Sequence, residues 1–264
     1  MRAVTGAYLR RDWQVWSSYS FAAAWQVMVV VVVVIGVAFA GDSLVAKSAA
    51  FNGSTNFAPF VLGGLAFTDA LMSALTGPSR AVRDGQTSGT LEPILLTPIR
   101  VWQMIIASSA FQIVLAFCRA LLVLGAAVVF LGYWHHANVP AVVLVFVPAF
   151  FTFLGIGLLA SAFTMLVKQG DPVVGGYLAL SGILGGTLVP LALLPSWVRG
   201  ISELLPLTHA LEGLRSALDG GSFSSVAGPV GVLSVMAVVA LPAGVVAAGR
   251  ATQRARREGS LVVY

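Results

Sequence analysis

The sequence predicts an all-α membrane protein with six transmembrane helices, folded as a single domain over residues 1–264. Its composition is the first indication: 58% of the residues are hydrophobic and 9% are charged, whereas charged residues make up about a quarter of a soluble domain. The second is that its apolar runs reach the roughly 20 residues that a helix needs to cross a hydrocarbon core. The runs are too long for barrel strands and do not alternate, which favours helices.

Six apolar runs are long enough to be spans. They cover residues 20–40, 57–77, 104–131, 142–167, 173–194 and 226–249. The fifth is the weakest helix signal, because its several glycines lower helix propensity, although glycine is common in membrane helices. Ala38-Phe39-Ala40 resembles a signal-peptidase site. The long apolar stretch and the polar region of about 20 residues before it favour a retained span.

The basic residues indicate the orientation. With a cytoplasmic N-terminus, eleven of the 15 Lys and Arg residues lie in inner segments, three lie in outer segments, and Arg119 lies within a span. This is the positive-inside pattern, so we expect both termini to be cytoplasmic. The net charge of +5 then reflects topology and contact with anionic membrane lipid, and does not indicate a nucleic-acid partner.

Two segments outside the spans have amphipathic patterns. Residues 1–19 interleave aromatic and basic residues, which is typical either of a helix lying in the membrane interface or of an ordinary flank of the first span. Residues 195–225 are too short to cross, and predict two half-immersed outer helices, 196–205 and 208–218, broken at Pro206. In the second, an apolar stripe of Leu207, Leu211, Leu214 and Leu218 opposes a polar side with Glu212, Arg215, Ser216 and Asp219.

A polar cassette at 83–98 separates the second and third runs. Thr97 and Pro98 are a typical N-cap and first helical residue, so the third span begins before its apolar core. Ahead of them, Ser88 or Thr90 can cap a separate short helix that ends near Leu96. On that helix Leu91, Ile94 and Leu95 share one face, while Glu92 points elsewhere.

The cassette resembles the cytoplasmic coupling segment of ABC type-2 permeases, through its Gly-Thr-Leu-Glu string followed by Thr-Pro. The Leu-Pro-Ser-Trp and Leu-Pro-Leu-Thr-His-Ala-Leu-Glu-Gly-Leu-Arg strings within 194–215 and the inner turn at 168–172 resemble the same family, in the same order. The tail at 256–261 resembles a bacterial subgroup of it, and Pro93 is a local departure from the pattern.

The resemblance implies the permease subunit of a bacterial ABC exporter in the inner or plasma membrane. Family members move amphiphilic cargo outward, including drugs, antibiotics, lipids, glycolipids and polysaccharides, and spans one, two and five form the path. Two copies of a separate ATPase subunit would bind ATP and Mg beneath two permease protomers, which are identical or similar. The chain has no Gly-x-x-x-x-Gly-Lys-Ser/Thr motif, so no nucleotide cofactor and no enzyme activity are expected on it.

The alternatives to a permease are a membrane scaffold that does not transport and an intramembrane enzyme. An enzyme needs a catalytic constellation within the spans. Catalytic residues and metal ligands are not expected, because His135 and His136 are adjacent and so face different ways on a helix, with no third ligand nearby.

The resemblance also implies the sites. ATPase coupling is expected at Gln86, Gly89, Thr90, Leu91, Glu92, Thr97, Pro98, Lys168 and Asp171. The plainer alternatives are a solvated loop with a capping glutamate and an ordinary turn at 168–171. Gly182 and Gly186 form a Gly-x-x-x-Gly pattern that suits close helix contact, and we expect it at the dimer interface.

Asp69 and Arg119 are the two formal charges inside apolar runs. Each costs about 3 kcal/mol to insert, so such groups tend to pair or to face water. At 1.5 Å per residue, Asp69 lies roughly 16 Å above Arg80 and Arg119 roughly 22 Å above Met104, which a long arginine side chain can bridge. We expect an intramembrane polar pair, either as a structural ion pair, which is favoured, or as a latch or cargo contact.

Overall fold

The computed structural model describes residues 2–18, 20–40, 57–89, 101–133, 136–167, 171–188, 191 and 195–258. In these residues the secondary structure is helical, without strands. The helices are α1 (Arg2–Ser18), α2 (Ser20–Ala40), α3 (Phe57–Thr87), α5 (Val101–Leu131), α6 (Val139–Leu166), α7 (Asp171–Leu184), α8 (Ser196–Ser202), α9 (Pro206–Leu218) and α10 (Phe223–Glu258).

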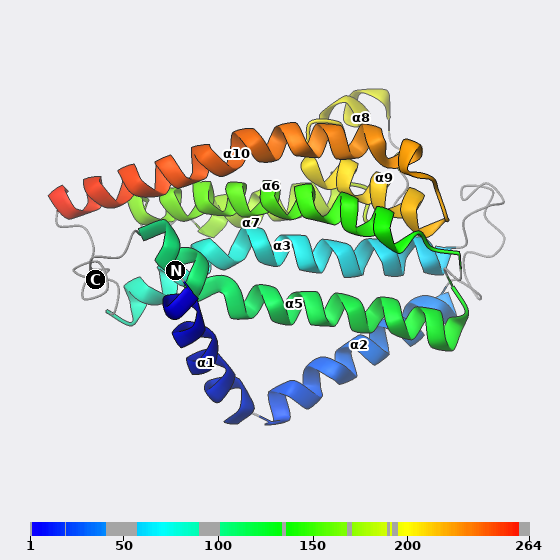
Figure 1. The fold of residues 1–264 in the computed structure, drawn as a ribbon, viewed down its shortest axis with the longest axis horizontal. Coiled ribbons are helices and arrows are strands. Elements are labelled where there is room, and N and C mark those ends of the chain that lie inside the picture. Colours follow the sequence, from blue (N-terminus) through cyan, green and yellow to red (C-terminus); the bar gives the residue numbers. More distant parts are fainter. Residues whose placement is uncertain are drawn as a thin grey trace.

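Four long helices, α10, α6, α3 and α5, run side by side (Figure 1). The short helices α8 and α9 lie at one end of this bundle, and α1 lies at the end where α10 finishes. Helix α2 diverges from α5 as a separate arm (Figure 1). Among the α2 side chains that the structure describes, only Val34 is buried, at 6% exposure, so α2 joins the bundle through its C-terminal half.

The four long helices are each long and apolar enough to cross a membrane, which makes the protein a multi-pass membrane protein. The first predicted span coincides with α2 at both ends. Its apolar core, and that of α7, are shorter segments at Met28–Phe39 and Val173–Leu184. The end predicted for the fifth span, residue 194, is wrong: α7 finishes at Leu184, because a turn through Gly186 with a φ of 81° follows.

Helix α3 is the centre of the bundle and continues to Thr87, ten residues beyond the predicted end of the second span. It passes through Pro78, which has no N–H to donate to the carbonyl of Ala74. The backbone of α6 covers this point at Gly157, where an added Cβ would lie 2.7 Å from the Ala74 carbonyl oxygen. The close approach of α6 therefore encloses the stretch of α3 that lacks a helical hydrogen bond.

Helices α6 and α10 also pack backbone to backbone. A Cβ added at Gly155 would lie 2.6 Å from the Ala240 carbonyl carbon, so only glycine fits there. Across the same contact, the Thr152 hydroxyl donates to the Leu233 carbonyl at 3.0 Å. Small residues at such contacts let helices approach closely, which is how membrane helices associate without a hydrophobic driving force.

The two helices predicted at 196–205 and 208–218 are present with different bounds, because α8 ends at Ser202 and α9 begins at Pro206. Pro206 is the first residue of α9, where a missing N–H costs nothing, so the proline begins the helix after the break. The predicted stripe of α9 is buried in the main core cluster, which α3, α6 and α10 complete. At the opposite end, α1 forms a helix of its own and packs Trp16 edge-on against Phe111 of α5, with ring centroids 6.5 Å apart.

Candidate functional site

An ion pair joins α3 and α5. The Arg119 Nε donates to one Asp69 oxygen at 3.0 Å and its Nη2 donates to the other at 3.3 Å, which is a bidentate arrangement. The structure thus brings together the two charges that the sequence placed within reach of each other. The side chains remain 27% and 47% exposed for Arg119 and Asp69, so the pair is open on one side.

Both partners lie at the same depth. Asp69 is twelve residues from Phe57, the first residue of α3, and Arg119 is twelve residues from Leu131, the last residue of α5. At 1.5 Å per residue each charge is about 18 Å from its helix end. Each charge therefore lies well inside a helix of membrane-spanning length, where charged groups are costly.

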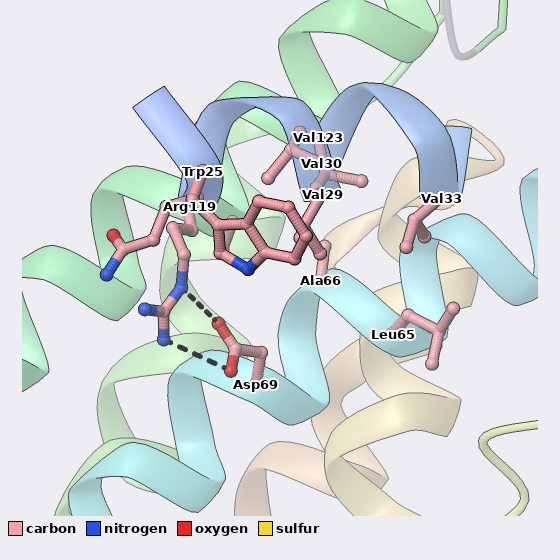
Figure 2. Close-up of a pocket in the computed structure, with 11 residues that line it drawn as sticks. Trp25, Val29, Val30, Val33, Leu65, Ala66, Asp69, Arg119 and Val123 are labelled. Atoms are coloured by element: carbon pink, nitrogen blue, oxygen red, sulfur yellow. Dashed lines mark hydrogen bonds and ion pairs between the residues drawn. The ribbon is translucent and has the colours of Figure 1, made fainter. Parts of the chain in front are cut away.

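The open side of the ion pair faces a cavity of about 450 Å³ in the wedge between α2, α3 and α5 (Figure 2). We call this cavity the polar pocket. It is lined by Trp25, Gln26, Val29, Val30 and Val33 of α2, Leu65, Ala66 and Asp69 of α3, and Arg119, Ala120 and Val123 of α5. Its volume lies within the range of about 300–1,000 Å³ that small-molecule sites occupy.

The polar pocket has hydrogen-bonding capacity that the protein does not use. A guanidinium has five N–H donors, and the described residues give Arg119 no acceptor besides Asp69. Gln26 adds an amide, and the Trp25 indole points into the pocket near the ion pair (Figure 2). The arrangement combines a few polar groups with an apolar wall, which is the usual make-up of a site for an amphiphilic molecule.

Sequence reasoning identified Asp69 and Arg119 but missed Trp25 and Gln26. Both residues lie in the first turns of an otherwise apolar helix. A lone glutamine before a valine run is a usable signal, because an unpaired amide inside hydrocarbon is costly and so tends to face protein or a cavity.

A second polar contact lies at the end of the bundle that carries α8 and α9. The Arg215 Nη2 of α9 donates to the carbonyl of Gly186 at 2.7 Å, and the guanidinium carbon lies 3.5 Å from the centre of the Phe60 ring. Thr187 continues the contact to α3, with its hydroxyl 3.2 Å from that of Thr68. We call the set Arg215, Gly186, Thr187 and Phe60 the outer clasp, because it ties α9, the end of α7 and α3 together.

The outer clasp corrects two expectations. Arg215 turns inward between α3 and α7, and its burial lowers its pKa to about 10, an effect that Asp219 partly offsets. Gly182 and Gly186 do not share a helix, because α7 ends between them and Gly186 has a positive φ. The Gly-x-x-x-Gly pattern therefore forms no helix face, although an added Cβ at Gly182 would meet open space.

Only part of the coupling segment is described. Residues 83–87 complete α3, and Gln86 is buried there at 7% exposure. Ser88 donates its hydroxyl to the Asp84 carbonyl at 2.6 Å and Gly89 has a φ of 67°, so the chain leaves α3 at this point. The expected coupling residues outside the described part are Thr90, Leu91, Glu92, Thr97, Pro98 and Lys168.

The other predicted positions lie far from the polar pocket along the chain. Asp171 is the first residue of α7, and His136 is an exposed turn residue between α5 and α6, while His135 lies outside the described residues. In the part of the chain that the structure describes, no three metal-ligating side chains cluster.

Comparison with known proteins places this architecture in a family. The family model of the ABC-2 type transporter matches residues 2–218. The chain is similar to the probable multidrug ABC transporter permease YbhR of Escherichia coli K12, with 21% identity over 164 residues, which are 60% of this chain and 43% of that protein. The protein of the same name from Escherichia coli O157:H7 matches equally. The match spans less than half the length of these curated relatives. Because the family match covers most of the chain, it confirms the resemblance seen in the coupling segment, and this chain belongs to the ABC-2 type transporter family, whose members are the permease subunits of ABC transporters.

Proposed function

We propose that this chain is the permease subunit of a bacterial ABC exporter that moves an amphiphilic molecule out of the cell. The candidate cargoes are drugs, antibiotics, lipids, glycolipids and polysaccharides. The observation that supports this most directly is the ion pair that opens onto the polar pocket at mid-depth in a family member. An exporter needs polar protein groups within the bilayer, because its cargo carries polar groups through hydrocarbon, where they are costly without a partner.

Family membership implies an ATPase partner. We propose that this partner is a separate subunit in two copies, that it holds ATP and Mg, and that two permease protomers, identical or similar, sit above it. ATP-driven closure of the ATPase pair would press on the coupling cassette. Such coupling requires contacts that differ between two states of the permease.

The connectivity supports transmission from the cassette to the polar pocket. The cassette joins α3 to α5, and these two helices carry Asp69 and Arg119 respectively. Asp69 and Gln86 lie on one continuous helix, seventeen residues or about 26 Å apart. Displacement of the cassette therefore moves both partners of the ion pair through rigid elements and alters the width of the pocket between them.

We further propose six spans, formed by α2, α3, α5, α6, the stretch that begins with α7, and α10, in the inner or plasma membrane with both termini cytoplasmic. The excess of basic residues in the inner segments supports this orientation. So does the position of α1 at the end of the bundle where α10 finishes (Figure 1). In this arrangement α8, α9 and the outer clasp lie on the outer side, and α1 lies in the cytoplasmic interface.

The test is ATP hydrolysis by the complex of permease and ATPase across a panel of amphiphilic cargoes, with Glu92→Arg as the diagnostic variant. The charge reversal should leave the permease inserted and abundant, but impair assembly with the ATPase or abolish cargo-stimulated hydrolysis. Glu203→Arg is the matched control, because Glu203 is exposed at the end of α8 on the outer side. Transport and stimulation at the wild-type level in Glu92→Arg would remove Glu92 from the mechanism.

A further inference from the structure

The polar pocket has a charged end and an apolar end. In chain order, α2 and α5 contribute their polar residues first, while α3 contributes Asp69 last. Because α3 runs opposite to α2 and α5 (Figure 1), these residues meet at one end of the pocket. They are Trp25, Gln26, Asp69 and Arg119, and the lining beyond them is apolar. A site with this polarity suits a molecule with a headgroup and a chain.

The charged end of the pocket carries no net charge, but its two charged side chains can still accept further polar partners. Asp69 and Arg119 neutralise each other, yet 47% of the Asp69 side chain remains exposed and Arg119 has N–H groups without an acceptor among the described residues. Burying a ligand of one net charge would leave the low-dielectric site with an unbalanced charge, which is costly. A ligand with one charge of each sign satisfies both partners and keeps the site neutral.

Each half of such a ligand has a suitable partner. The planar guanidinium of Arg119 matches the geometry of a phosphate or carboxylate group. An ammonium group is attracted by the Asp69 carboxylate and by the face of an indole ring such as that of Trp25. The apolar wall extends along α2 from Trp25 to Val33, eight residues or about 12 Å, which provides a track for an alkyl chain.

We propose that the polar pocket binds a zwitterionic amphiphile as export cargo, with its anionic group on Arg119, its ammonium group between Asp69 and Trp25, and its chain against the valines of α2. This assignment rests on the proposed function, because the proposed topology turns the charged end of the pocket inward. The bound molecule then has the orientation of a lipid in the inner leaflet, with its headgroup inward and its chain outward. The pocket is thus a loading site for cargo taken from that leaflet.

Binding is tested on the full permease in maltoside micelles by native mass spectrometry. The probes are single-chain amphiphiles with the same alkyl chain and a phosphocholine, phosphate or trimethylammonium headgroup. Phosphocholine should bind about ten-fold more tightly than either singly charged probe, since it alone satisfies both charges. Equal binding of the three probes, or tighter binding of a singly charged one, would overturn the proposal.

A double substitution locates the binding. Asp69→Asn with Arg119→Gln removes both charges together, strands neither, and should lower phosphocholine affinity about ten-fold. The matched control is Arg11→Gln with Asp12→Asn, which removes an exposed ion pair of 2.7 Å on α1 and should change nothing. Val33→Trp fills the apolar end, leaves both charges in place, and should also abolish binding. Unchanged affinity in either pocket variant would overturn the proposal.

The outcome separates this assignment from the proposed function, because binding requires neither ATP nor the ATPase. Stimulation of hydrolysis by other cargoes without phosphocholine binding would overturn the zwitterion site and leave the exporter intact. Phosphocholine binding that neither stimulates hydrolysis nor leads to transport would identify a resident lipid and overturn the cargo assignment. Binding followed by stimulation supports both.

Discussion

Removing one partner of the Asp69–Arg119 ion pair leaves an unpaired charge within the membrane-spanning helices. Two charges at mid-depth are tolerable because each lowers the cost of the other, and a single charge keeps its desolvation cost without that compensation. The openness of the pair to the polar pocket supports the cargo-contact interpretation over the purely structural one that the sequence favoured. The two interpretations differ in what the double variant does.

We predict that Asp69→Asn and Arg119→Gln each lower the melting temperature of the purified permease, and that the double variant recovers part of the loss. In a double-mutant cycle the coupling free energy should exceed about 0.5 kcal/mol. A double variant that folds normally and no longer exports assigns the pair to function. Simple additivity would contradict direct pairing.

Arg215 should be needed for the stability of the outer clasp. Arg215→Ala leaves the Gly186 carbonyl without its charged donor and removes the stack on Phe60, so we expect a loss of about 1.5–3 kcal/mol in thermal unfolding. Arg215→Lys keeps the charge but not the planar fork, and should recover only part of it. Arg250→Ala, at an exposed position on α10, is the control and should be near neutral. Equal melting temperatures for Arg215→Ala and the control would show that the clasp contributes nothing.

At the scale of elements, the α6–α10 contact depends on glycine backbone. Gly155→Ala puts a Cβ 2.6 Å from α10 backbone atoms that cannot rotate away, so the helices must separate, at a cost of about 1–3 kcal/mol. Gly231→Ala is the matched control on α10, since a Cβ there meets nothing within 4 Å and alanine is the better helix former by about 1 kcal/mol. Thermal unfolding should rank the variants Gly231→Ala, wild type, Gly155→Ala from most to least stable. The reverse order would contradict the close packing.

The elements also mark where sequence reasoning succeeds. Hydropathy located α2 at both of its ends, and the leucine stripe located the buried face of α9, because both signals are periodic and local. The ends of α3 and α7 were missed for tertiary reasons. Gly157 of α6 covers the gap that Pro78 leaves in α3, and Arg215 of α9 holds the turn that terminates α7. Neither partner is near in sequence to the helix that it affects.

The same distinction holds for the candidate site. Asp69 and Arg119 are visible in the sequence because a charge in an apolar run is conspicuous, and counting residues along the two helices placed them within the reach of a long arginine side chain. Trp25 and Val33 become pocket residues only because α2 diverges from the bundle, which no local pattern encodes. The inward turn of Arg215 likewise depends on Phe60, more than 150 residues away in the chain.

At the scale of the whole molecule, the orientation is open to a direct test. In a Cys118→Ser background, which removes the only native cysteine, Asn138→Cys should react with a membrane-impermeant thiol reagent in intact cells, while Gln253→Cys should not. Asn138 caps the first turn of α6, and Gln253 lies exposed in the last turns of α10. Lysed cells are the control in which both positions should react. Labelling of Gln253→Cys in sealed cells would contradict the cytoplasmic C-terminus.

The proline in α3 has a mechanical consequence. A helix that lacks a backbone hydrogen bond ordinarily bends at that point. Pro78 lies between Asp69 and the end of α3 that leads into the cassette. Here the backbone of α6 lies against that point, so bending α3 would require prying the two helices apart. The contact with α6 therefore stiffens α3 at Pro78, and in the proposed mechanism a displacement at the cassette end of α3 reaches Asp69 with little loss to bending. A bulky residue in place of Gly157 would push α6 away from Pro78. The proposed displacement of α3 would then be lost in bending at Pro78 before it reaches the ion pair.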